Sequence, residues 1–181
     1  MRGLDVAQEL VTLTQRMHGQ APAPLALIKL AYFAHGWHLA MADVPLLDET
    51  IEAWPTGPIV PSIYHAVRHW RSSPVLNVCG ARPAQINPVT QKILNDTVRA
   101  YGAFDPVALS SLAHASGTPW AVVRDLSPDR NAPISNAHLT DHFRRLLFDA
   151  RPDTSTASAS SASSGQVVSF PRAPRPEPIP S

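Results

Sequence analysis

The chain has 181 residues, of which 44% are apolar, so it suits one domain with its own core and an appendage. The formal net charge is +1, and residues 1–150 carry 12 basic and 12 acidic side chains, which argues against a large nucleic-acid surface. The single cysteine, Cys79, excludes an intramolecular disulfide. The first ten residues contain acids and lack the apolar run of a signal peptide, so we expect a cytoplasmic protein.

Residues 4–17 predict the first helix, because their apolar side chains recur at helical spacing. Asp5 and Gln8 stand in the positions of a capping box at its start. Gly19 follows the last turn, where a glycine commonly ends a helix.

Residues 25–42, LALIKLAYFAHGWHLAMA, are helical in period yet apolar on nearly every side. A helix without a polar face is a buried helix, and only Lys29, His35 and His38 interrupt this one. Its length also approaches the roughly 20 residues of a membrane span. The three polar side chains and the lack of aromatic or basic anchors at both ends argue against a span. We expect this helix at the centre of the domain, with the other elements packed around it.

Residues 50–70 are predicted to form a short strand, then a proline-rich turn, then a helix. Residues 50–54 alternate well enough for a short strand, as in one half of a hairpin, and the three prolines and one glycine of residues 54–61 exclude a regular helix. From Pro58 the helical period returns, and we expect an amphipathic helix with a basic stripe on its outer face. Its apolar face contains Ile59, Val60, Ile63, Val67 and Trp70, and its basic stripe contains His65, Arg68 and His69.

A polar cap followed by proline marks the start of three more helices. These helices are predicted to begin at Asn87, Asp105 and Thr118 and to end at Tyr101, Gly117 and Leu126, and a last helix begins at Ser135. Residues 72–88 are typical of a loop, in which residues 75–79 are a candidate small strand. The predicted fold class is therefore mainly α: a compact helical domain around a buried central helix, with a small β-hairpin or short strands at most.

The composition changes abruptly after residue 150. Residues 151–181 are rich first in serine and alanine and then in proline, so they lack the apolar surface that offsets chain entropy, and we expect disorder. We therefore assign residues 1–150 to the helical domain and residues 151–181 to a tail. One apolar island in the tail has two interpretations, a chance cluster or a short docking peptide. It consists of Gln166, Val167, Val168 and Phe170 with the serine between them.

The residue pattern contains no visible active site. Three histidine pairs have helical spacing, namely His35 with His38, His65 with His69, and His138 with His142. Each pair could contribute to a zinc site, but no HExxH motif and no cysteine pair accompanies them. The chain also lacks a GxSxG nucleophile elbow and a phosphate-binding P-loop. We expect a protein without cofactor or enzymatic activity, and a histidine-dependent metal hydrolase is the weakest alternative.

Residues 52–61 are unusually rich in tryptophan, proline and glycine. They have two compatible interpretations, a rigid corner of the fold and a rigid apolar rim that binds a protein partner. The candidate partner-binding residues are Trp54, Gly57, Pro58, Pro61, His65 and Arg68. Tyr32, Trp37 and Trp120 are assigned to the core instead.

Three blocks in this order resemble the Panacea domain, which is found in SocA-type antitoxins and in phage-associated proteins. The blocks are LIKLAYFAHGWHLAM, PLLDETIEAWPTGPIVPSIYHAVR and LSSLAHASGTPW. The resemblance covers about residues 4–124. Ala31 departs from it, since the family pattern has a bulkier leucine there.

This resemblance implies an antitoxin that neutralises a cognate protein toxin by direct contact. For SocA-type members it further implies a proteolytic adaptor that delivers the toxin to the ClpXP protease. The alternative from a different class is a DNA-binding regulator of its own operon, for which the support is His65, Arg68, His69 and Arg71. Four such residues on a neutral domain predict only weak, salt-dependent DNA binding.

Overall fold

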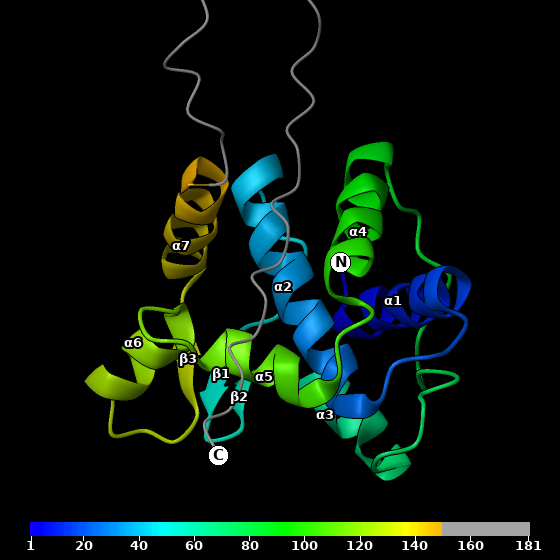
Figure 1. Ribbon diagram of the computed structural model, residues 1–181, viewed down its shortest axis with the longest axis horizontal. Helices are drawn as coiled ribbons and strands as arrows, with labels where there is room; N and C mark the ends of the chain where they lie inside the picture. Colours follow the sequence, from blue (N-terminus) through cyan, green and yellow to red (C-terminus); the bar gives the residue numbers. More distant parts are fainter. Residues whose placement is uncertain (150–181) are drawn as a thin grey trace, which may run out of the picture.

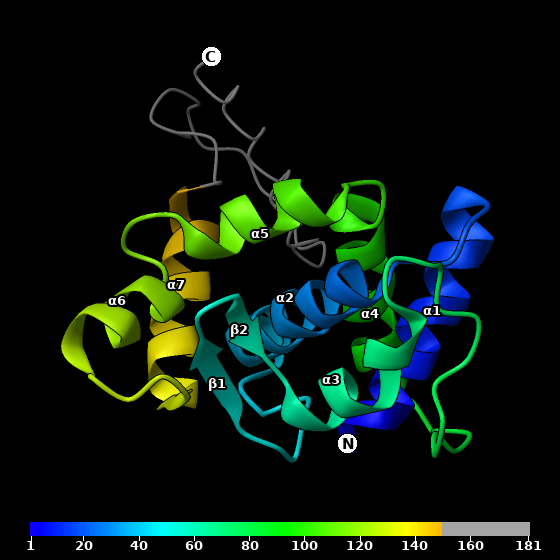
Figure 2. The same ribbon diagram turned by 90° about the horizontal axis from the view of Figure 1, so that it is seen from below.

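Helix α2 (Pro24–Ala42) runs through the middle of the molecule, and most of the other helices pack around it (Figure 1). The computed structural model describes residues 1–149. Every residue of α2 from Ala26 to Leu39 is buried, which confirms the prediction of a helix without an exposed face. The neighbours of α2 are α1 (Gly3–His18), α3 (Pro61–Val67), α4 (Pro88–Tyr101), α5 (Pro106–His114) and α7 (Asn136–Asp149). In Figure 2, α5 and α3 lie on opposite sides of it.

Local capping fixes where three of these helices begin. Asn87 Oδ1 accepts a hydrogen bond from Thr90 N at 2.9 Å, and Asp105 Oδ1 accepts one from Ala108 N at 2.8 Å. Thr118 does the same for α6 (Pro119–Leu126). These starts are confirmed, because a cap and a following proline act within one turn and need no distant partner. Helix α5, however, ends at His114, before the predicted end.

The capping box predicted for α1 is wrong. Arg2 occupies the N-cap without a side-chain hydrogen bond. Asp5 and Gln8 instead accept hydrogen bonds from the backbone N–H groups of Arg82 and Val78, and so attach the loop before α4 to α1. The predicted end is confirmed, since Gly19 caps the helix at φ 77°.

A three-stranded antiparallel sheet lies beside the helices. Its central strand is β1 (Ile51–Trp54), between β2 (Gly57–Ile59) and β3 (Ala132–Ile134). The predicted short strand and its hairpin are confirmed, and β3 is an addition that the sequence did not reveal. Ile51 pairs with Ile134 across more than 80 residues. The mainly α fold class is confirmed.

Two local predictions around the sheet are wrong. The helical period does not resume at Pro58, because Pro58 and Ile59 belong to β2 and α3 begins at Pro61, followed by a short 3-10 helix, η1 (Arg68–Trp70). Residues 75–79 form no strand, since Val75 N donates to Pro22 O in a loop. In both cases apolar residues are buried by tertiary packing without forming the element that their pattern suggested.

An aromatic cluster closes the core between α2 and α7. The ring of Phe143 lies directly over Gly36, where a Cβ atom would collide with it. Trp37 packs edge-on against Phe143 with ring centroids 4.9 Å apart, and Tyr101 of α4 stacks on Phe33 at 4.4 Å. Tyr32 and Trp37 are core residues, as predicted.

None of the helices within residues 1–149 has the length and apolarity that crossing a bilayer requires. Residues 151–181, with the island at Gln166, Val167, Val168 and Phe170, lie outside the described residues.

Candidate functional site

Residues from the three sequence blocks meet beneath the turn between β1 and β2. Lys29 of α2 is fully buried, and its Nζ donates hydrogen bonds to the backbone oxygens of Thr56 at 3.0 Å and Pro58 at 3.1 Å. These carbonyl groups lie on either side of Gly57 at the turn. The lysine therefore holds the hairpin turn from the inside of the molecule.

Burial lowers the pKa of Lys29 to about 7. No ion pair within residues 1–149 involves this amine. A neutral amine carries two N–H groups, one for each of the two carbonyl oxygens. The hydrogen bonds to the turn can therefore form whether or not Lys29 is charged.

Glycine at position 57 suits both the backbone conformation and the crowding of this turn. Its φ is 106°, which side-chain-bearing residues rarely adopt. A Cβ atom at this position would collide with Lys29 Nζ and with His114 Nε2. The glycine therefore allows α2, the hairpin and α5 to approach one another closely.

His114 is the last residue of α5, and its ring stacks on that of Trp120 with centroids 4.2 Å apart. Its Nε2 is buried without a well-formed hydrogen bond. Burial lowers the pKa of His114, the charge of Lys29 lowers it further, and the backbone of Thr56 opposes the shift. The imidazole is therefore mainly neutral at pH 7.

Two tryptophans connect the hairpin to the neighbouring helices α6 and α3. Trp120 Nε1 donates to the backbone oxygen of Trp54 at 2.7 Å, and Trp54 Nε1 donates to Glu52 Oε2 at 2.6 Å. The Trp54 ring packs edge-on against Tyr64 of α3, with centroids 5.0 Å apart. Trp120 is half-buried and anchors the hairpin, so its role is more specific than the predicted core role. These hydrogen bonds and ring contacts fix the position of the hairpin.

The predicted partner-binding residues differ in exposure. His65 and Arg68 are exposed, Trp54 and Pro61 are half-buried, and Gly57 and Pro58 are buried. The last two can therefore support a contact surface from beneath but cannot form it. Pro55 and Thr56 at the tip of the turn are exposed, and sequence reasoning did not select them.

The histidine pairs do not assemble a metal site. No group of three or more metal-binding side chains occurs within residues 1–149. His35 Nδ1 accepts a hydrogen bond from Leu47 N at 3.1 Å, and its Nε2 bonds Asn136 Oδ1 at 3.0 Å. His38 forms two hydrogen bonds as well, from Nδ1 to Val44 O and between Nε2 and Thr90 Oγ1. Both rings therefore serve the packing of the core.

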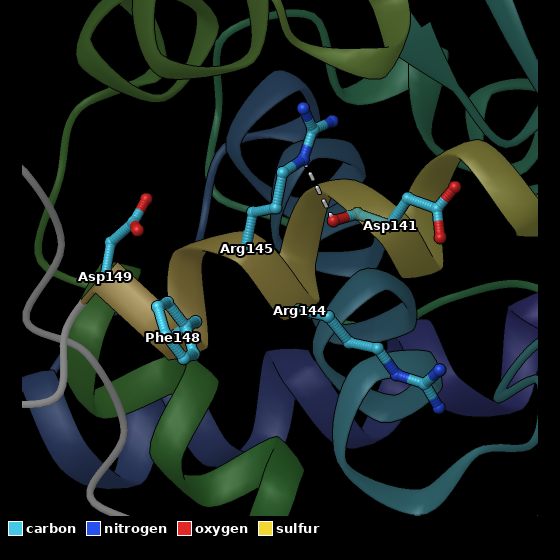
Figure 3. A pocket seen from close by; sticks show the side chains of 5 residues that line it. All are labelled: Asp141, Arg144, Arg145, Phe148 and Asp149. Atoms are coloured by element: carbon cyan, nitrogen blue, oxygen red, sulfur yellow. Dashed lines mark hydrogen bonds between the residues drawn. The ribbon is translucent and has the colours of Figure 1, made fainter.

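A surface cavity of about 570 Å³ lies along α7, away from the hairpin turn. The side chains that line it diverge, and the one hydrogen bond among them runs from Arg145 Nε to the backbone oxygen of Asp141 at 3.2 Å (Figure 3). The lining residues are Asp141, Arg144, Arg145, Phe148 and Asp149. Because no nucleophile or general base converges with a binding group there, the cavity does not have the geometry of an active site.

Known proteins resemble this chain over the region that contains the hairpin turn and the residues that hold it. The family described as "Antitoxin SocA-like, Panacea domain" matches residues 27–121, which include Lys29, Gly57, His114 and Trp120. The chain is 28% identical over 134 residues to Antitoxin SocA of Caulobacter vibrioides (strain NA1000 / CB15N), covering 66% of this chain and 71% of that protein. No solved structure matches. The chain belongs to the SocA-like antitoxin family defined by the Panacea domain.

Proposed function

We propose that this protein neutralises a cognate protein toxin by binding it directly with the hairpin turn and the exposed face of α3. The observation that carries the proposal is the attachment of the turn to Lys29 and Trp120, which holds the exposed tip in one conformation. A contact surface that is already ordered loses less conformational entropy on binding and so binds more tightly.

The chemistry of this surface suits a protein partner. The half-buried aromatic pair of Trp54 and Tyr64 lies beside exposed His65 and Arg68. Interfaces commonly combine aromatic anchors with a polar rim, and arginine and aromatic residues are enriched among the residues that dominate binding energy. Binding of this kind needs no catalytic group, so we propose a protein that is not an enzyme.

We further propose that the protein acts as an adaptor in the cytoplasm and delivers the toxin to the ClpXP protease. An adaptor holds its cargo with one surface and the protease with another, which raises the effective concentration of cargo at the protease. The helical domain is assigned to the toxin and residues 151–181 to the protease. This assignment follows from family membership and from the division of the sequence at residue 150.

Growth rescue tests the neutralisation. The toxin candidate is the protein encoded beside this one, expressed at a level that stops growth, and wild-type antitoxin is expected to restore growth. Thr56→Arg puts a large charged side chain at the tip of the turn but leaves the backbone oxygen that Lys29 binds. We expect this variant to fold and to lose rescue.

The matched control is Val107→Arg on α5, where the wild-type side chain is 62% exposed. It is expected to rescue growth as the wild type does. Equal rescue by both variants would show that the turn does not contact the toxin, and failure of the wild type would contradict the antitoxin function with this partner.

A further inference from the structure

The charge of this protein is unevenly distributed along the chain. No aspartate or glutamate occurs between Glu52 and Asp96, although residues 1–150 as a whole are neutral. The basic residues within this acid-free segment are His65, Arg68, His69, Arg71, Arg82 and Lys92. Such a segment carries an excess of positive charge, of which Lys92 is neutralised by an ion pair with Asp96.

Four of these residues are exposed within one short stretch of the structure. His65, Arg68, His69 and Arg71 are all exposed on α3, η1 and the residue that follows, and we call them the basic face. None of the ion pairs within residues 1–149 involves them. Two acidic side chains lie near α3. Glu49 lies close to Ser62 at the opposite end and accepts a hydrogen bond from Gly3 N, and Glu52 accepts one from Trp54 Nε1, whose ring packs on Tyr64.

The backbone keeps the two arginines close together. Arg71 N donates to Arg68 O at 3.2 Å in a tight turn, and Arg71 adopts φ 55° and ψ −106°, a region that residues other than glycine rarely occupy. Strained residues of this kind concentrate at functional sites. Neither arginine takes part in an ion pair within residues 1–149, so an anionic group of a partner would reduce the repulsion between these two like charges.

We propose that the basic face binds an acidic segment of the cognate toxin. This inference rests on the proposed function and specifies the chemistry of the partner. The ten residues from Pro61 to Trp70 extend over about 15 Å, which suits a short run of carboxylates on the partner. Carboxylates pair well with arginine because its planar guanidinium donates two parallel hydrogen bonds.

The neighbouring residues favour a protein over a nucleic acid. The rings of His65 and Tyr64 lie 5.4 Å apart, and Tyr64 in turn packs on Trp54, so the basic face continues into the aromatic surface of the hairpin. A charged rim beside an aromatic anchor is the usual arrangement of a protein interface. Duplex DNA would require a wider positive surface than two arginines and two histidines on a neutral domain provide.

The experiment measures the dissociation constant between the full-length chain and the toxin encoded beside it, at several salt concentrations. The test variant is Arg68→Glu with Arg71→Glu, and the control is Arg130→Glu with Arg145→Glu, which changes the net charge equally at exposed sites elsewhere. We expect the test variant to weaken binding about tenfold or more and to flatten its salt dependence, whereas the control stays within about twofold of the wild type. Circular dichroism and thermal unfolding establish that both variants fold.

A charge-swap series completes the design. Acidic residues of the toxin are changed singly to arginine, and one or more changes are expected to restore binding to the Arg68→Glu, Arg71→Glu variant. Unchanged affinity in the test variant overturns the inference but leaves the antitoxin function intact, whereas no binding by the wild type contradicts both. Loss of a promoter-DNA gel shift in the test variant, with toxin affinity unchanged, would assign the basic face to nucleic acid and also overturn the inference.

Discussion

Lys29 is buried without a carboxylate partner, which is costly for a charged amine but acceptable for a neutral one. The two carbonyl oxygens of the turn make the site polar enough to hold the amine. A methionine would fill the same volume but leave both oxygens unpaired. The lysine therefore serves the geometry of the turn, and its charge is incidental to that role.

This burial predicts a specific dependence of stability on pH. The pKa of Lys29 is about 7 in the folded protein and about 10.4 in an unfolded chain. Between these values the unfolded state binds more protons, so the free energy of unfolding should rise with pH, by up to about 1.4 kcal/mol per pH unit. Urea unfolding at pH 7, 8 and 9 measures this slope.

Lys29→Met is the comparison, because it removes the titrating group and so should remove this part of the slope. The comparison uses the slope of the unfolding free energy against pH and not its absolute value, because the variant also loses two hydrogen bonds and starts from a lower stability. Parallel pH profiles for the two proteins would contradict a lowered pKa at Lys29. His114 next to it titrates below this range, because its pKa is lowered from an ordinary value near 6.5.

At the scale of elements, the hairpin is contacted by one side chain from each of the helices α2, α5 and α6. Lys29 Nζ, His114 Nε2 and Trp120 Nε1 approach its turn or its first strand from three helices. The close approach depends on Gly57, which has both a positive φ and no room for a side chain. The orientation of the hairpin is thus set by the helices around it.

Gly57→Ala tests this dependence. It should lower the free energy of unfolding by about 1–3 kcal/mol from backbone strain, and by more from the collision with Lys29 and His114. Gly19→Ala is the matched control, because Gly19 also has a positive φ, 77°, but no atom within 4 Å of the added Cβ. Chemical denaturation should show a clearly larger loss at Gly57, and equal losses would mean that the crowded turn can relax.

At the scale of the whole molecule, the adaptor proposal divides the chain between two tasks. Deleting residues 152–181 should leave the affinity for the toxin unchanged and slow the degradation of the toxin by ClpXP. Degradation is followed in a reconstituted reaction with the full-length chain as reference. Unchanged degradation would show that these residues are only a linker, and lost toxin binding would show that the domain does not act alone.

The sequence by itself determined most of the helices and the central position of α2. Caps such as Asn87 and Thr118 act within one turn, and a helix that is apolar on every side has to be buried wherever it lies. The resemblance in three blocks also identified the family, and the matched region 27–121 agrees with it.

Only the tertiary structure decided how the candidate site is built. Strand β3 has three residues and no readable period, and it exists because β1 offers it backbone hydrogen bonds. Lys29 contacts the backbone of Thr56 and Pro58, which lie 27 and 29 positions after it in the sequence. His114, which also approaches the turn, lies much farther along the chain. Spacing along a sequence reports which face of one element a residue occupies, whereas these contacts depend on how separate elements pack. For that reason the burial of Gly57 and Pro58 could not be foreseen, nor could the exposure of Thr56.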